Sequence, residues 1–281
     1  MLLYYGGFFT YKDNLVGYNG QDYMGIGQFL FLGFGILIII LLSIFLRNIS
    51  HKKIDAYLKI MTFVIPGLEI LKITIESICD IQAGHGFNFT GLLPLYTCSL
   101  FIYTLPLAAF GKGKVKEISL SFLSTIGIFA GMTNFIMSPI LNTYPFFNFH
   151  TFISLNFHFW MVFTGVFLLA TRYYVPQNKD ILKGMIPVFI ISIFAIPIDY
   201  ILKCDYMLLY YGNGAPILPS ISKFFADIKI GDFDLRILYT ITTLIIYVII
   251  NIIIVLVIKS IVNGIKYFQK NNYTINHIIC Y

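Results

Sequence analysis

The sequence predicts an all-α, polytopic membrane protein, a seven-transmembrane-helix bundle with the N-terminus outside and the C-terminus in the cytoplasm. Three observations predict it: the composition, the spacing of long apolar runs, and the distribution of basic residues. Hydrophobic residues make up 58% of the 281 residues, charged residues 11%, and the mean hydropathy is +0.82. Soluble domains carry about 25% charged residues. So few charges cannot cover a water-facing surface, and most of this surface is expected to face lipid.

Apolar runs mark the predicted spans. A helix needs about 20 mainly apolar residues to cross a hydrocarbon core about 30 Å thick. Seven segments meet this requirement, at 25–46, 56–79, 89–110, 118–137, 150–171, 184–202 and 235–258.

Basic residues predict the orientation, because cytoplasmic loops are enriched in Lys and Arg. With the N-terminus outside, 13 of the 19 Lys and Arg residues fall on the cytoplasmic side, 5 fall outside, and Lys72 lies within a span. The 13 are Arg47, Lys52, Lys53, Lys59, Lys112, Lys114, Lys116, Arg172, Lys179, Lys183, Lys259, Lys266 and Lys270. We therefore expect a multi-pass protein of the plasma membrane. The amino-acid composition is typical of an AT-rich genome, which suggests a bacterial membrane.

The same reading divides the chain into three parts. Residues 1–24 form an aromatic segment outside the membrane, 25–259 the membrane domain, and 260–281 a basic cytoplasmic tail. The outer loop 204–234 contains an amphipathic stretch at 217–230, which is either a lid along the outer surface or a plain connection.

Charge and cysteine usage exclude some partners. The net charge of +6 lies mostly in short loops that set topology, so we expect membrane lipids and no nucleic acid as partners. The four cysteines show no CxxC motif and no metal-ligand spacing, so we expect no metal and no cofactor. Cys79 and Cys204 both lie at outer span ends, where they either pair or stand together by accident.

Charged residues within a span are costly and are therefore candidates for function. Glu69, Lys72 and Glu76 lie in the outer half of the second span, and their spacings of three and four place them on one helix face. They are candidate substrate-binding residues. The alternative is a structural ion cluster in which Lys72 pairs with a glutamate.

Cys98 and His158 are the candidate catalytic pair. Both predicted spans run inward, and each residue lies roughly 12–14 Å below the outer boundary at about 1.5 Å per residue. A thiol beside an imidazole is the minimal arrangement for an activated cysteine nucleophile. The alternatives are a small packing residue for Cys98 and a helix–helix hydrogen bond for His158.

Asn134 and Asn156 are further candidates for substrate binding in the fourth and fifth spans. Amides at this depth more often join helices than bind ligands.

Two short motifs carry a resemblance to a known family. Residues 93–100, Leu-Pro-Leu-Tyr-Thr-Cys-Ser-Leu, resemble the LPLxxCSL signature of the YwaF family of bacterial integral membrane proteins, which is related to animal transmembrane protein 164. Asp205-Tyr206-Met207-Leu208-Leu209, with Pro216 downstream, resembles that family's NYMxL…P segment. His158 stands where the family carries a histidine in its fifth span.

The resemblance implies a lipid-active membrane enzyme, a cysteine-dependent acyltransferase on phospholipids, with Cys98 as nucleophile and His158 as base. It also makes Asp205 and Tyr206 candidate substrate-side residues. The chain departs from the pattern in two places: Asp205 replaces an asparagine, and Gln28 is the nearest residue to a histidine expected early in the first span.

Three functions follow from these observations. The first is an acyltransferase or acyl hydrolase that takes phospholipids from the outer leaflet. The second is a small-molecule transport or substrate-binding subunit, because charged clusters within spans also mark transport sites. The third is a non-catalytic scaffold whose polar residues join helices. A vitamin binder should retain a soluble ligand through purification, whereas a lipid enzyme should not.

Overall fold

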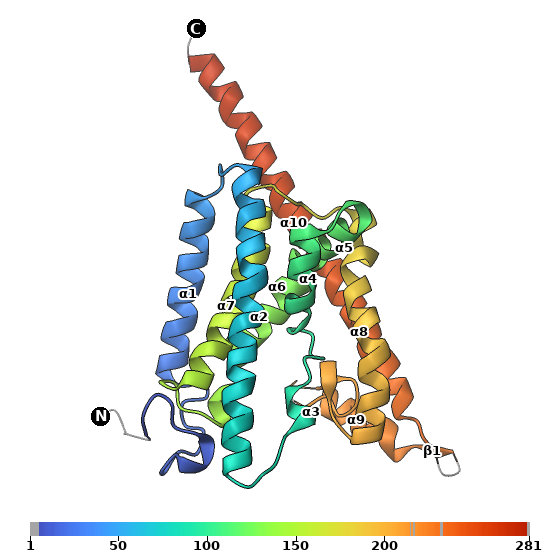
Figure 1. Ribbon diagram of the computed structural model, residues 1–281. Helices are drawn as coiled ribbons and strands as arrows, with labels where there is room; N and C mark the ends of the chain where they lie inside the picture. The colour runs from blue at the N-terminus through green and yellow to red at the C-terminus, as the bar shows by residue number, and fades with distance from the viewer. Residues whose placement is uncertain (1–5, 214, 216, 231–232, 280–281) are drawn as a thin grey trace.

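A computed structural model gives the architecture, and it describes residues 6–213, 215, 217–230 and 233–279. Residues 1–5 and 280–281, which end the predicted terminal segments, therefore lie outside the described residues. The chain is a helical bundle whose N-terminal segment lies at the lower end of Figure 1, while the last helix projects above the upper end.

The α-helices are α1 (Ile26–Phe45), α2 (His51–Gln82), α3 (Phe89–Leu92), α4 (Leu100–Phe110), α5 (Gly113–Leu123), α6 (Ile126–Met137), α7 (Phe149–Ala170), α8 (Ile181–Leu202), α9 (Leu218–Asp227) and α10 (Arg236–Ile279). Short 3₁₀ helices are η1 (Lys12–Asn14), η2 (Pro139–Asn142), η3 (Asn178–Asp180) and η4 (Tyr206–Leu208). A small antiparallel hairpin pairs β1 (Lys229–Ile230) with β2 (Phe233–Asp234).

Five helical segments of the described chain are long and apolar enough to cross a membrane. They are Ile26–Phe45, Gly113–Asn142, Phe149–Ala170, Asn178–Leu202 and Arg236–Gly264. The predicted second span lies within α2, which is 32 residues long but carries charged residues in both of its halves. The predicted third span contributes only the 11-residue α4. The all-helical membrane class is therefore confirmed, whereas the count of seven and the orientation stay predictions.

The predicted span over 89–110 is not one continuous helix. Helix α3 ends at Leu92, and Leu93 is extended with φ −65° and ψ 124°. The reason is Pro94, because a proline ring disfavours helical geometry in the residue before it and removes a backbone donor. The chain resumes as α4 only at Leu100, so residues 93–99 form an irregular segment inside the bundle.

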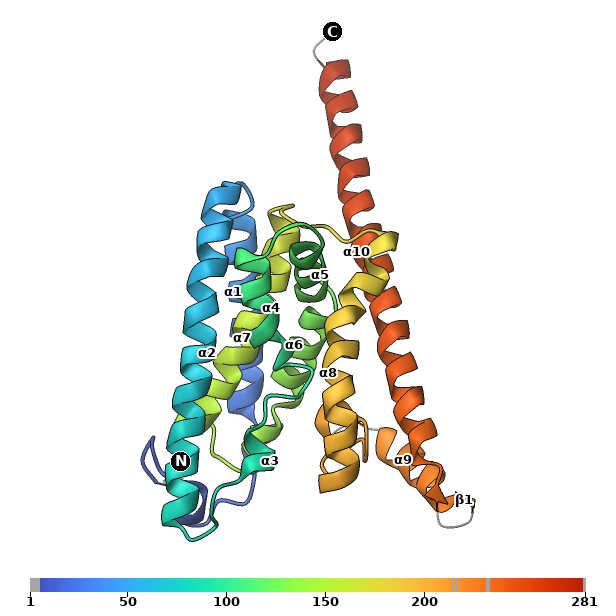
Figure 2. The same cartoon turned by 45° about the vertical axis from the view of Figure 1, so that its right-hand side comes forward.

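The helices pack closely around that irregular segment. In Figures 1 and 2, α2, α4 and α7 lie beside one another, and α8 runs next to α10. The α6–α7 contact depends on Gly165, where an added Cβ would meet Ile128 Cγ1 at 2.3 Å. Such close approach is typical of membrane helices, where small residues let backbones touch.

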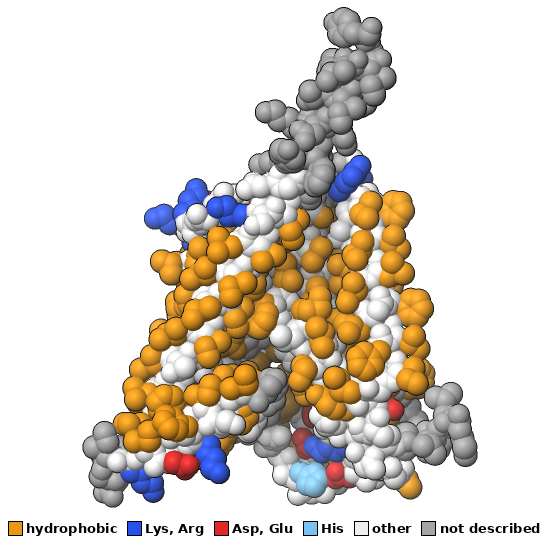
Figure 3. All heavy atoms as spheres, turned by 180° about the vertical axis from the view of Figure 1, so that it is seen from behind, with side chains coloured by type: hydrophobic (Ala, Val, Ile, Leu, Met, Phe, Trp, Pro, Cys, Tyr) orange, Lys and Arg blue, Asp and Glu red, His pale blue; other side chains and the backbone are white. Residues whose placement is uncertain are grey.

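The outer surface of the bundle suits lipid. Large apolar side chains face outward on several helices, including Phe34 on α1, Phe63 on α2 and Ile193 on α8. Figure 3 shows hydrophobic side chains over most of the height of one face, with basic side chains at its upper edge. A notch opens at the lower end of this face, where side chains of both charges gather.

The N-terminal segment is fastened to the lower end of the bundle. The backbone N–H of Phe149 donates to Phe8 O at 2.7 Å. Lys12 Nζ lies 3.0 Å from Asp80 Oδ1 at the end of α2, and the Tyr11 hydroxyl donates to the same carboxylate. Cys79, Cys98 and Cys204 are free thiols, so Cys79 and Cys204 do not pair.

Candidate functional site

Cys98 lies in the irregular segment, just before helix α4. Its carbonyl accepts the backbone N–H of Phe101 at 3.0 Å, and Ser99 N–H donates to Tyr96 O at 3.0 Å. These two bonds form the turn that starts α4. The break caused by Pro94 therefore places the thiol in the wall of a cavity, at the N-terminal end of a helix, and not on a lipid-facing helix surface.

His158 is held in one tautomer by its own helix. Its Nδ1 lies 2.8 Å from the carbonyl oxygen of Ser154, one turn earlier on α7. A carbonyl oxygen only accepts, so Nδ1 carries the hydrogen and Nε2 keeps the lone pair. Nε2 is buried and has no hydrogen-bond partner among the described residues. The imidazole is therefore arranged as a base with a free basic nitrogen.

A cavity of about 130 Å³ brings these two residues together with the charged side chains of α2. Glu69, Lys72, Glu76, Cys98 and His158 all line it, and we call it the polar cavity. Lys72 Nζ lies 2.6 Å from Glu69 Oε1. The Cys98 thiol, the His158 imidazole and a partly neutralised charged cluster thus share one small space.

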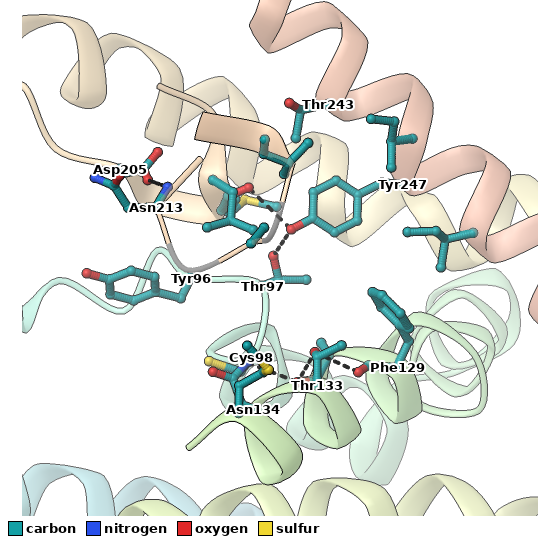
Figure 4. Close-up of a pocket in the computed structure, with 18 of the residues that line it drawn as sticks. Tyr96, Thr97, Cys98, Phe129, Thr133, Asn134, Asp205, Asn213, Thr243 and Tyr247 are labelled. Atoms are coloured by element: carbon teal, nitrogen blue, oxygen red, sulfur yellow. Dashed lines mark hydrogen bonds between the residues drawn. The ribbon is translucent and has the colours of Figure 1, made fainter. Parts of the chain in front are cut away.

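A second, larger pocket of about 620 Å³ begins at the same cysteine. We call it the apolar chamber. Cys98 and Tyr96 line both spaces and separate them. Figure 4 shows Cys98 and Asn134 together at one side of the chamber, with Thr243 on the opposite side. Its apolar walls include Phe129, Ala130, Met137, Met207, Ile246 and Ile250.

Comparison with known protein families gives a match over most of the chain. The TMEM164 family matches residues 23–250, a stretch that contains both cavities and every candidate residue. The chain belongs to the TMEM164 family. The resemblance expected from the motifs around Cys98 and Asp205 is thereby confirmed. No curated protein and no solved structure shows significant similarity to the chain.

In this TMEM164-family chain, the two asparagines have different positions. Asn134 lines the apolar chamber, and its Nδ2 donates to Ala130 O at 3.1 Å. Asn156 donates to Phe152 O at 2.8 Å on its own helix and lines neither cavity. The structure therefore brings Asn134 to the candidate site and leaves Asn156 outside it.

Asp205 and Tyr206 organise the outer segment. The Asp205 carboxylate accepts backbone N–H groups from Tyr210, Tyr211, Gly212 and Asn213, at 2.7–3.1 Å. It thereby holds the loop that edges the apolar chamber, which it also lines.

Tyr206 is fully buried, and its hydroxyl donates to Thr90 O. Burial raises the pKa of the Tyr206 phenol, so it stays protonated as a donor. It lines neither cavity, and its contacts fasten the outer segment to α3.

Two residues that line the chamber, Thr97 and Tyr247, were not among the candidates predicted from the sequence. Thr97 Oγ1 and Tyr247 Oη are 2.8 Å apart, and Tyr247 also donates to Met207 O at 3.2 Å. This pair joins α10 to the turn that carries Cys98. A tyrosine among the aliphatic residues of 244–250 was an available signal, because buried tyrosine hydroxyls usually find a partner.

Proposed function

We propose that this protein is an integral membrane acyltransferase or acyl hydrolase that acts on phospholipids through Cys98 and His158. The observation that carries the proposal is the free Nε2 of His158 on the wall of the same cavity as the Cys98 thiol. Covalent acyl transfer needs a nucleophile and a base that come within hydrogen-bond reach of each other, and two groups that line one small cavity can do so when a substrate binds. Ser154 O, which fixes the tautomer, stabilises the imidazolium that forms after proton transfer.

The first half of the reaction forms a thioester. His158 Nε2 takes the proton of the Cys98 thiol, and the thiolate attacks the carbonyl carbon of a lipid ester. The carbon–oxygen bond then breaks, and the imidazolium returns its proton to the leaving alkoxide. The products are a lysolipid and an acyl group on Cys98.

The second half regenerates the enzyme. His158 takes a proton from an acceptor hydroxyl, which is water for a hydrolase and a lysolipid for a transferase. The acceptor oxygen attacks the thioester, the carbon–sulfur bond breaks, and the Cys98 sulfur is reprotonated by the imidazolium. Glu69, Lys72 and Glu76 would contact the polar groups next to the ester carbonyl at the polar cavity.

The proposal includes the predicted topology of seven crossings with the N-terminus outside. Two features support this topology. Basic side chains lie at the upper end of the bundle, and α2 runs along the length of the bundle. This orientation opens the polar cavity toward the outer leaflet of the plasma membrane.

The test is labelling of intact membranes with a hydrophobic thiol-reactive probe, followed by identification of the labelled peptide. We expect labelling of Cys98 at neutral pH, loss of the label in Cys98→Ala, and strong suppression in His158→Ala with the protein still folded. Asn156→Ala is the control, because its side chain lies on α7 outside the cavity. Equal labelling of Cys98 with and without His158 would refute the pair and favour transport, for which the charged cluster on α2 is the supporting observation.

A further inference from the structure

The apolar chamber has no part in the proton transfers described above, although it starts at the reacting sulfur. We propose that it is the acyl-chain site: it holds the hydrocarbon chain of the group attached to Cys98, and its far wall on α10 sets the chain length. The role of Cys98 in this inference rests on the proposed function, whereas the chamber itself is tested without turnover.

The polar cavity and the apolar chamber differ in volume, and the difference indicates a different role for each. The polar cavity, at about 130 Å³, has room for a carbonyl group and the atoms next to it, but not for a lipid chain. The chamber, at about 620 Å³, falls in the range of about 300–1,000 Å³ that is usual for ligand pockets. An acyl group on Cys98 must extend somewhere, and the chamber is the large space that this residue lines.

The chemistry of the walls also favours a hydrocarbon. Side chains from α6, α10 and the outer segment that face the chamber are mostly apolar. Several of the polar groups among them form hydrogen bonds within the protein. Thr97 bonds Tyr247, Thr133 Oγ1 donates to Phe129 O at 2.9 Å, and Asn134 donates to its own helix. A chain without polar groups therefore leaves these hydrogen bonds intact.

The outer segment covers the chamber. Leu218, at the start of α9, is one of its lining residues together with Asn213 and Ala215. The Asp205 carboxylate fixes the loop just before them through its four backbone bonds. The chamber is thus bounded by a segment with its own fastening, as expected of a space that holds a chain away from water.

Chain length is set by the wall opposite the cysteine. Figure 4 places Thr243 across the chamber from Cys98, and Thr243 is almost fully buried on α10. A phenylalanine there would shorten the path available to a chain. Phe129 on α6 also lines the chamber, and its removal would lengthen that path.

The experiment measures how fast Cys98 reacts with a series of straight-chain alkyl methanethiosulfonates. The thiolate attacks the sulfenyl sulfur of the reagent, a protein–alkyl disulfide forms, and methanesulfinate leaves. The modified Cys98 peptide is quantified by mass spectrometry in detergent-solubilised full-length protein. The modification rate of each variant is divided by the wild-type rate at the same chain length. This ratio cancels the partition of the reagent into micelles.

We expect the wild-type rate to rise with each added methylene, by up to about fourfold per group, until the chamber is full. In Thr243→Phe the rise should stop several methylenes earlier, and in Phe129→Ala it should continue further. Thr242→Phe, the neighbouring position that does not line the chamber, and Phe34→Ala, which faces outward on α1, should keep the wild-type profile.

The outcomes separate this inference from the proposed function. A Thr243→Phe profile and a Phe129→Ala profile that both match wild type would overturn the acyl-chain site. His158→Ala should lower the rate by one common factor at every length. His158→Ala could instead leave the rate unchanged while Thr243→Phe still stops the rise at a shorter chain length. That result would refute the catalytic pair and still support the acyl-chain site. If Thr243→Phe does not fold, Phe129→Ala alone decides.

Discussion

The hydroxyl of Tyr247 fastens the last helix to the centre of the bundle, and Tyr247→Phe removes only that oxygen. The side chain is buried, and its hydroxyl makes two contacts within the protein, with Thr97 Oγ1 at 2.8 Å and Met207 O at 3.2 Å. The substitution leaves the ring in place and both partners without this bond.

The loss can be estimated from the bonds themselves. Hydrogen bonds between membrane helices contribute about 0.6 kcal/mol on average and up to about 1.7 kcal/mol. Two bonds of this kind give about 1–2 kcal/mol, which is roughly a tenfold change in the folded-to-unfolded ratio. We therefore expect Tyr247→Phe to be destabilised by this amount when unfolding is followed in mixed micelles.

The matched control is Tyr103→Phe. Tyr103 makes one long bond, 3.3 Å to Pro94 O, at an exposed position, so its hydroxyl contributes little. Equal unfolding curves for Tyr247→Phe and wild type would refute the reasoning. An equally large destabilisation of Tyr103→Phe would also refute the reasoning. Burial would then not determine how much a tyrosine hydroxyl contributes to stability.

Three further predictions concern packing, the outer segment and pH. Gly165→Leu should lower stability by about 1–3 kcal/mol, because its Cβ meets α6 at 2.3 Å, whereas Gly33→Leu, with open space around it, should not; thermal unfolding compares them. Asp205→Ala should speed proteolysis of the loop at 210–213, and Asp205→Asn should do so less, because an amide oxygen still accepts. Burial opposes the charge on Lys12, but its bonds to a tyrosine and an aspartate raise its pKa above the ordinary 10.5. The stabilisation by Lys12 should therefore be complete below about pH 10.5 and be lost as the pH rises through the higher pKa of the folded state. The difference in stability between Lys12→Met and wild type should narrow only in strong alkali.

The sequence was sufficient to predict which residue shares a cavity with Cys98, but not the backbone conformation around Cys98. Counting residues along helices placed Cys98 and His158 at one depth, and the structure places both on the polar cavity. The count assumed a continuous helix, however, and Pro94 breaks it. Cys98 and His158 nevertheless line the same cavity.

Helical spacing worked where the helix is regular. Glu69, Lys72 and Glu76 were predicted on one face of the second span, and all three line the polar cavity on the unbroken α2. The same logic could not separate Asn134 from Asn156, because which side of a helix faces a cavity depends on its neighbours.

The apolar chamber was beyond sequence reasoning. Its walls come from α6, from the outer segment and from α10, which are distant along the chain. Short motifs identify the residues around Cys98 and Asp205, but they carry no information on the space between Phe129 and Ile250. The space forms where α10 packs against α6.

The central claim is that Cys98 carries an acyl group through the action of His158. The most direct measurement is to incubate purified protein in mixed micelles with a phospholipid and to search the Cys98 peptide for an acyl adduct that hydroxylamine removes. We expect such a thioester on Cys98 in the wild type, a much smaller amount in His158→Ala, and none on Cys79 or Cys204. Lipid turnover without any thioester on Cys98, or with equal adducts on the other cysteines, would contradict it.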